Sequence, residues 1–377
     1  MRRHRRAKIV ATLGPSSSSR ECIYNLFRAG ADIFRLNFSH GTHAEHLNRF
    51  NVVREIEKEF NRPIAILGDL QGPKLRVGNF KSGEALLEVW KYFRLDLSSD
   101  LGDMNRVSLP HPEIFSTLEK GSEILLDDGQ IRLTVKSHGD DFANTIVEFG
   151  GRLTDHKGVN LPDTKLDICA VTPKDREDIQ FALRSGFDWL ALSFVQGPED
   201  IKEARNIIGP NASIMAKLEK PAALDSLSDI VHLSDAIMVA RGDLGVELAP
   251  EEVPAKQKEI VRAARQAGKP VVVATQMLES MIENPRPTRA EVTDVATAIR
   301  QGASCIMLSG ETATGAHPVI TVETMAKIAV SVEEENRKLG HNPELSSYQS
   351  TRAVANAGVE LATGADVDRL IVATEHA

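Results

Sequence analysis

Short runs of mostly apolar residues recur along the chain, and most are followed by a segment with the periodicity of an amphipathic helix. Near-continuous apolar strands that alternate with helices are typical of a parallel sheet covered by helices. Eight such units predict an α/β fold of the (β/α)8, or TIM, barrel type rather than an open sheet. The runs are residues 8–14, 32–41, 64–72, 188–195, 213–219, 235–243, 270–276 and 304–312.

The repeat is interrupted once, between about Gly72 and Thr172, where short alternating stretches are separated by Gly and Asp turns. We therefore expect an all-β lid domain at residues 73–169, inserted after the third strand. The barrel itself would then comprise residues 1–72 and 170–340. An insertion at the catalytic end of a barrel is well placed to close over an active site.

The end of the sequence has a different character. A long helix is expected at Val319–Leu339, and the segment that follows it is typical of a linker. Residues 345–377 then predict one helix and one strand, which cannot bury a core of their own. We interpret them as the beginning of a truncated α/β carboxyl-terminal domain.

Several of the apolar runs end in polar side chains, and a barrel carries its active site at the carboxyl ends of its strands. The strands could also end in polar residues simply because strand ends are exposed to water. That explanation does not account for residues at a spacing of two, which place alternate side chains on one face. The polar residues concerned are Arg35, Asn37, Ser39, Asp69, Gln71, Lys217, Glu219, Arg241, Asp243, Thr275, Ser309 and Glu311.

Glu219 and Asp243 follow consecutive strands, so we expect them side by side at the barrel mouth. Two carboxylates with no His or Cys nearby in sequence suit a hard divalent cation, Mg²⁺ or Mn²⁺. Salt bridges to Lys217 and Lys220 are the alternative. Lys217 shares a face with Glu219, and together with Arg35 it would favour an anion, as phosphoryl transfer and enolate chemistry require.

The stretch "ARGDLG" places Gly242 and Gly245 around Asp243. Small residues at a helix start let backbone N–H groups reach a ligand carboxylate, although Gly-Asp also forms ordinary turns. The sequence contains no Walker P-loop and no G-x-G-x-x-G motif, so a nucleotide would be held by other means.

Composition and charge narrow the class of protein. The 377 residues carry a formal net charge of −8, which argues against a general nucleic-acid surface. The basic start "MRRHRR" is more typical of a solvated tail than of a binding element. No run approaches the roughly 18 apolar residues of a membrane span. Three scattered cysteines indicate reduced thiols in a cytoplasmic protein, and Cys305 is expected in the core.

The strand ends together resemble the motifs of pyruvate kinases. The resemblance runs in unbroken order from about residue 7 to 340 and rests on "RLNFSHG", "GDLQGPKLR", "GVNLP", "KLEK", "MVARGDLGVE", "ATQMLESM", "RPTRAEVTDVA" and "MLSGETATG". It implies a glycolytic phosphotransferase that converts phosphoenolpyruvate and ADP into pyruvate and ATP. It also implies that Mg²⁺ or Mn²⁺ is required.

The resemblance assigns roles to the charged residues. It implies that Glu219 and Asp243 hold the protein-bound Mg²⁺, and that a second Mg²⁺ arrives with ADP. It implies that Lys217 and Arg35 stabilise the transferring phosphoryl group.

The resemblance also assigns residues to the two substrates. The amides of Gly242 and Asp243 and the hydroxyl of Thr275 would hold the substrate carboxylate, and Thr275 would lie on the path that protonates the enolate. The implied nucleotide contacts are Pro15, Arg35, Asn37, His40, Arg76 and Lys174.

Many members of the family depend on K⁺, and the resemblance places its ligands at Asn37, Ser39, Asp69 and the backbone of Leu70. Here Leu70, Gln71 and Lys74 resemble the K⁺-independent branch, since K⁺-dependent members carry Glu at the position of Lys74. At about 4 Å and an effective dielectric constant near 20, a tethered ammonium is worth on the order of 4 kcal/mol. We predict that Lys74 replaces K⁺, with an ordinary surface lysine as the alternative.

Some alternatives stay open. The family's carboxyl-terminal domain usually carries an effector site, which we expect to be absent, so any homo-oligomer would form through barrel–barrel contacts. Another Mg²⁺-dependent barrel that handles pyruvate enolates, such as an aldol lyase, is a rival, although the β-rich insertion and Lys174 argue against it. A truncated chain that folds and binds ligand without catalysis is a second rival.

Overall fold

The computed structural model describes residues 3–162 and 169–338. The chain divides into two compact units, Met1–Glu333 and Glu334–Ala377. The expected carboxyl-terminal remnant at residues 345–377 lies outside the described residues.

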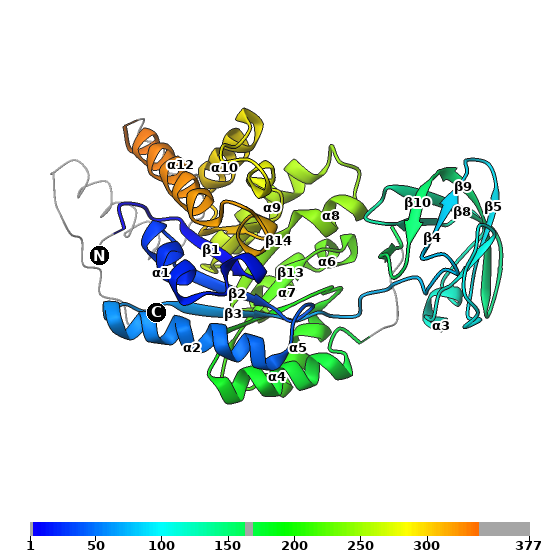
Figure 1. The fold of residues 1–377 in the computed structure, drawn as a ribbon, viewed down its shortest axis with the longest axis horizontal. Coiled ribbons are helices and arrows are strands. Elements are labelled where there is room, and N and C mark those ends of the chain that lie inside the picture. The colour runs from blue at the N-terminus through cyan, green and yellow to red at the C-terminus, as the bar shows by residue number, and fades with distance from the viewer. Residues whose placement is uncertain (1–2, 163–168, 339–377) are drawn as a thin grey trace. The chain divides into compact units, whose positions relative to one another are not determined.

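A closed barrel of parallel strands forms the centre of the first unit (Figure 1), which confirms the predicted fold class. In the described part of the chain the barrel has eight strands, and they correspond one to one to the eight apolar runs. Their order around the barrel is β1 (Lys8–Leu13), β16 (Cys305–Leu308), β15 (Val271–Ala274), β14 (Ala236–Ala240), β13 (Ser213–Leu218), β12 (Trp189–Leu192), β3 (Ala65–Asp69) and β2 (Ile33–Asn37).

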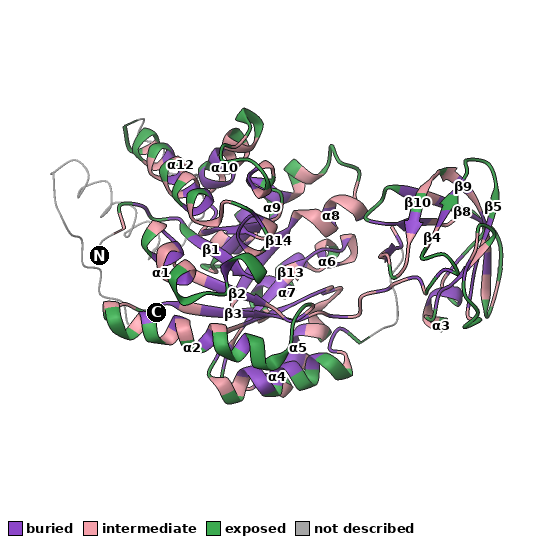
Figure 2. Cartoon of the chain, viewed as in Figure 1, coloured by how far each residue is buried: buried purple, intermediate pink, exposed green. Residues whose placement is uncertain are grey.

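The barrel strands are mostly apolar because both of their faces are largely buried (Figure 2). In β1, Ile9 and Ala11 belong to the core shared with the surrounding helices, whereas Val10 packs among residues of the other strands. Cys305 is buried in that inner cluster, as expected.

All eight barrel strands end one to four residues before the corresponding apolar runs, and at two of them a helix follows. β14 ends at Ala240 and β16 at Leu308, because short helices begin almost at once, α8 (Arg241–Glu247) and α11 (Gly310–Ala313). Asp243 therefore lies in the first turn of a helix rather than at the end of a strand.

Helices surround the barrel, and several begin with reciprocal caps. Thr42 accepts a hydrogen bond from the Glu45 amide while the Glu45 carboxylate accepts one from the Thr42 amide. Among the described residues, no helix combines the length and apolar character that a membrane crossing requires. The helices are α1 (Arg20–Ala29), α2 (His43–Phe60), α4 (Pro173–Ser185), α5 (Pro198–Ile208), α6 (Pro221–Asp225), α7 (Leu227–Leu233), α9 (Val253–Gln266), α10 (Arg289–Gln301) and α12 (Pro318–Lys338).

The insertion after β3 is built from strands around a hydrophobic cluster of its own, which extends from Leu75 to Leu161. It also contains a short helix, α3 (Pro112–Phe115), so it is not strictly all-β. Two strands, β10 (Gly151–Thr154) and β4 (Glu84–Leu87), form one sheet. The second sheet has the order β11 (Val159–Asn160), β7 (Glu123–Leu126), β8 (Ile131–Gly139), β9 (Phe142–Phe149), β5 (Tyr92–Asp96) and β6 (Arg106–Ser108).

The basic amino-terminal segment is packed against the barrel, so the expectation of a solvated tail is wrong for its described residues. Arg5 is only 6% exposed, and its Nη1 lies 2.8 Å from Oδ2 of Asp32. The Arg5 guanidinium also donates to the carbonyls of Ala7 and Gly30, and Nη2 of Arg3 donates to the carbonyl of Ala31 at 3.1 Å. The buried carboxylate of Asp32 requires such partners.

Candidate active site

Charged side chains from neighbouring strands meet at the carboxyl end of the barrel. Arg35 on β2 and Asp69 on β3 form a buried ion pair, with 2.6 Å between Nε and Oδ2. Nζ of Lys217 on β13 lies 3.2 Å from Oδ1 of Asp69 and 2.7 Å from Oε1 of Glu219. We call Arg35, Asp69, Lys217 and Glu219 the charge cluster.

The pKa values of the charge cluster reflect burial and these pairings. Burial acts to lower the pKa of Lys217, but Asp69 and Glu219 hold it above its ordinary value. Burial acts to raise the pKa of Asp69, but Arg35 and Lys217 hold it below its ordinary value. Burial, with a smaller contribution from nearby Asp243, raises the pKa of Glu219 to about 7 against the opposing effect of Lys217.

The carboxylates fit a divalent cation. Oε1 of Glu219 is buried and accepts no hydrogen bond of acceptable geometry, although Nζ of Lys217 lies close to it. The described ranges hold no group of three or more His, Cys, Asp or Glu side chains suited to a metal. An ion at Glu219 and Asp243 would therefore complete its shell with water and substrate oxygens, as Mg²⁺ commonly does.

Salt bridges from Lys217 and Lys220 to Glu219 and Asp243 were the alternative to a metal site, and only one of them forms. Lys217 pairs with Glu219, but Lys220 pairs with Glu247 at the end of α8 rather than with either proposed metal ligand. Asn160 on β11 donates to the same Glu247 carboxylate at 2.7 Å, so this second pair links the insertion to the barrel.

The residues expected to hold a substrate carboxylate are adjacent. The Gly242 amide donates to Oγ1 of Thr275 at 2.6 Å, and that hydroxyl donates to the carbonyl of Ala274, also at 2.6 Å. A carboxylate bound to the Gly242 amide would therefore have to replace the Thr275 hydroxyl. Thr275 has φ +68°, which is rare for a β-branched residue and is typical of functional sites.

The residues expected to hold K⁺ are engaged within the protein. Oδ1 of Asn37 accepts a hydrogen bond from the Ser39 amide at 3.1 Å, and the Leu70 carbonyl accepts one from Oγ of Ser193 at 2.7 Å. Asp69 is bound by Arg35, as described above. Their interactions hold the loops after β2 and β3 in place.

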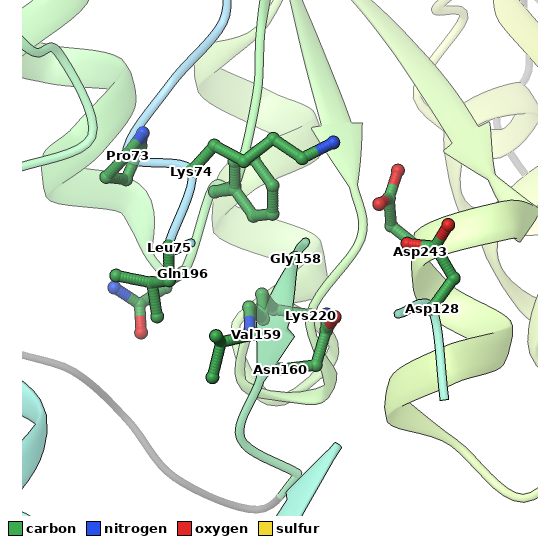
Figure 3. A pocket seen from close by; sticks show the side chains of 11 residues that line it. Pro73, Lys74, Leu75, Asp128, Gly158, Val159, Asn160, Gln196, Lys220 and Asp243 are labelled. Carbon is green, nitrogen blue, oxygen red and sulfur yellow. The ribbon is translucent and has the colours of Figure 1, made fainter. Parts of the chain in front are cut away.

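Lys74 lies in a pocket that also includes Asp243, and its side chain extends toward that carboxylate (Figure 3). Lys74 is only partly exposed there, and its replacement of K⁺ stays a prediction. The residues lining the pocket are Pro73, Lys74, Leu75, Asp128, Gly158, Val159, Asn160, Phe194, Gln196, Lys220 and Asp243.

Part of the expected nucleotide set is brought together around His40. Burial lowers the pKa of His40, and the charges of Lys74, Arg76 and Arg35 lower it further, so these three cations face it. A positively charged rim of this kind suits the phosphates of a nucleotide.

Two other expected nucleotide residues have different surroundings. Nζ of Lys174 donates to the Phe38 carbonyl at 2.7 Å and to Oδ2 of Asp178 at 2.6 Å, so its charge is already paired. Pro15 begins a short 3-10 helix, η1 (Pro15–Ser17), directly after β1.

Two residues that hold the charge cluster, Ser193 and Phe194, were not predicted from the sequence. Oγ of Ser193 accepts a hydrogen bond from Nζ of Lys217 at 2.7 Å and donates to the Leu70 carbonyl. The Phe194 amide donates to Oε2 of Glu219 at 2.7 Å. Both residues directly follow β12, and Ser193 is a polar residue at a strand end, the signal that identified its neighbours on other strands.

Comparisons with known proteins agree with this geometry. The family model described as "Pyruvate kinase, barrel domain" matches residues 4–322. A pyruvate kinase of Methylorubrum extorquens is 55% identical over 335 residues, which cover 89% of this chain and 70% of that protein. One from Agrobacterium vitis is 49% identical over 373 residues, covering 97% and 77%.

A solved structure gives the same result. The crystal structure of a pyruvate kinase from Cryptosporidium parvum superimposes with a TM-score of 0.89 at 35% sequence identity. The match covers 96% of this chain and 77% of that one. From the family model, the sequence relatives and this structure we conclude that the chain belongs to the pyruvate kinase family.

Proposed function

We propose that this chain is a phosphotransferase that moves the phosphoryl group of phosphoenolpyruvate to ADP and yields pyruvate and ATP in glycolysis. One observation carries the proposal: two cations, Arg35 and Lys217, are held by Asp69 beside Glu219 at the carboxyl end of the barrel. Fixed cations at a water-poor site stabilise the charge of a transferring phosphoryl group.

Asp69 gives these cations their catalytic geometry. Its two carboxylate oxygens bind Arg35 and Lys217 separately, so one carboxylate holds the guanidinium and the ammonium close together. The raised pKa of Lys217 keeps the ammonium charged throughout the physiological range. Because the pair is already assembled, little reorganisation is required when the substrate arrives.

We further propose that Glu219 and Asp243 hold Mg²⁺ or Mn²⁺. When bound, such an ion neutralises charge on phosphate and enolate oxygens. The surroundings of Glu219 support this assignment: its buried Oε1 has the Lys217 ammonium at 2.7 Å but no hydrogen bond of good geometry, and a second acid, Asp243, lies close enough to raise its pKa. The hydroxyl of Thr275, which donates to the Ala274 carbonyl, would lie on the path along which the enolate is protonated through water.

The remaining assignments follow from the same reasoning. Phosphoenolpyruvate would bind at Lys217, Gly242, Asp243 and Thr275.

The negative net charge supports small-molecule substrates rather than a nucleic acid. The cysteines form no disulfide, which supports a cytoplasmic location. A homo-oligomer formed through the barrels stays a prediction for sedimentation analysis. The proposed nucleotide contacts are Pro15, Arg35, Asn37, His40, Arg76 and Lys174.

A coupled assay for ATP tests the proposal directly. Purified protein with phosphoenolpyruvate, ADP and Mg²⁺ should form ATP, and Lys217→Ala should abolish the signal. Equal activity of this variant would identify a contaminating enzyme as the source. No ATP from the wild type would favour the aldol lyase or the non-catalytic protein, and aldol cleavage in the same preparation would separate these two.

We propose that Lys74 replaces the monovalent cation, so that K⁺ is not required. The wild type should keep its activity within about twofold when tetramethylammonium replaces K⁺. Lys74→Glu should become at least tenfold more active with K⁺ than without it, because the pocket near Asp243 then lacks a cation. Strong activation of the wild type by K⁺ would contradict the proposal.

A further inference from the structure

The turn after β15 holds two consecutive residues in the left-handed region. Thr275 has φ +68° and Gln276 has φ +51°. Neither is glycine, and Thr275 is β-branched, so the local sequence does not favour this conformation. Strained backbone of this kind persists only where the surrounding structure holds it.

Arg241 supplies that restraint. Its side chain is 10% exposed, and its Nε donates to the Ala274 carbonyl at 3.2 Å. Its Nη2 donates to the Thr275 carbonyl at 2.6 Å and contacts Sδ of Met277 at 2.8 Å. One planar guanidinium therefore binds the residue before the turn, the first residue within it and the residue after it.

The guanidinium is itself anchored from the outer helices. Nη1 of Arg241 lies 2.6 Å from Oδ2 of Asp294 on α10 and donates to Oε1 of Gln257 on α9 at 3.4 Å. These contacts use the edge that faces away from the turn, so the remaining donors stay aimed at the backbone carbonyls. A lysine ammonium cannot provide such a fork.

The neighbouring residue binds the side chain of the same threonine, because the Gly242 amide donates to Oγ1 of Thr275. We propose that Arg241 is a positioning residue for the reaction: it holds Thr275 in the left-handed conformation and keeps its hydroxyl beside Gly242 and Asp243. The inference rests on the proposed function, in which Thr275 acts on the substrate. Arg241 itself acts through Thr275 and not on the substrate.

A rescue experiment separates this role from simple structural support. Arg241→Lys should lower kcat about 30-fold, with less than a threefold change in KM for phosphoenolpyruvate. Gln276 is exposed, and glycine adopts its left-handed φ with little strain, so Gln276→Gly alone should leave kcat within twofold. Added to Arg241→Lys, it should restore kcat at least fivefold.

Arg205→Lys is the matched control. Arg205 pairs with Asp235 and donates to the carbonyls of Gly209 and Ala212, so it combines the same types of contact outside the candidate site. This variant should lower the melting temperature and leave kcat unchanged. A drop in kcat equal to that of Arg241→Lys would mean that general destabilisation explains both, and the proposal would be wrong.

A second measurement does not depend on turnover. Hydrogen exchange of the Thr275–Met277 amides should accelerate in Arg241→Lys and slow again when Gln276→Gly is added. If the wild type forms no ATP, the proposed function fails while this measurement still tests the positioning role. If Gln276→Gly restores neither kcat in an active enzyme nor protection of these amides, Arg241 does not act through the turn.

Discussion

Both ends of the barrel bury a carboxylate among cations. At the amino-terminal end, Asp32 precedes β2 and lies against Arg5, with Arg3 and Arg62 also within ion-pair distance. At the carboxyl end, Asp69 closes β3 and lies against Arg35 and Lys217. Residue types and burial are similar, so neither distinguishes a structural cluster from a catalytic one.

The two ends differ in the balance between acidic side chains and cations. Oδ2 of Asp32 accepts the Ile9 amide at 3.0 Å as well as pairing with Arg5, whose guanidinium also donates to backbone carbonyls. The carboxyl end holds two further acids, Glu219 and Asp243, so three acids there face two cations, and Oε1 of Glu219 has only the Lys217 ammonium close to it. A closed set of charges indicates support for the fold, and a surplus carboxylate indicates room for a cation.

The largest expected effect comes from removing the surplus acid. Glu219→Gln should lower kcat by about 10³-fold or more, since an electrostatic contact to the reacting groups is lost. The free energy of unfolding without Mg²⁺ should not fall, because the raised pKa of Glu219 means that its ionised form is disfavoured in the folded protein, and Lys217 keeps Asp69 as a partner. Steady-state kinetics and urea unfolding measure the two. A kcat within tenfold of wild type would contradict the assignment of Glu219 as a metal ligand.

Removing the Asp32 carboxylate, at the amino-terminal end of the barrel, should lower stability and leave kcat unchanged. Asp32→Asn should reduce the free energy of unfolding by about 3 kcal/mol, the lower part of the range for breaking a buried pair, because its cations lose their partner. At temperatures where the variant stays folded, kcat should be unchanged. Asp103→Asn is the control, since Asp103 pairs with Lys81 at the surface, where such pairs contribute about 0–1 kcal/mol. A drop in kcat for folded Asp32→Asn would break the comparison.

The barrel could be predicted from the sequence because a strand buried on both faces leaves an apolar run that few other elements produce. The ends of those runs were less certain. Asp243 lies in α8 and not in a strand, since a helix that begins directly after a strand adds no turn signal between them. The small helix α3 in the insertion was missed because four residues carry no periodicity.

The site was predictable where its residues share one strand or stand at the carboxyl ends of strands. Lys217 and Glu219 are two residues apart, so their common face could be expected. The part that Ser193 plays depends on the register between strands, which the sequence does not specify. Likewise Arg5 was expected in solvent because its partner, Asp32, is distant in sequence. The left-handed conformation of Thr275 opposes its intrinsic preference and so left no signal.

The last effect, which is spread over a range of pH, tests Glu219 by its protonation. Glu219 has a pKa of about 7 in the folded protein and 4.5 as an ordinary glutamate, so the folded state binds the proton more tightly. Stability should therefore fall as pH rises from 4.5 to 7, by about 3 kcal/mol in total. Urea unfolding in EDTA across this range should show that this dependence of stability on pH is absent in Glu219→Gln.

Mg²⁺ should stabilise the wild type more at pH 8 than at pH 5.5, since it competes with the proton on Glu219. If the free energy of unfolding varies with pH in the same way in wild type and Glu219→Gln, the charge of Glu219 is balanced by its neighbours in the folded protein. The distinction between the two ends of the barrel would then not rest on Glu219.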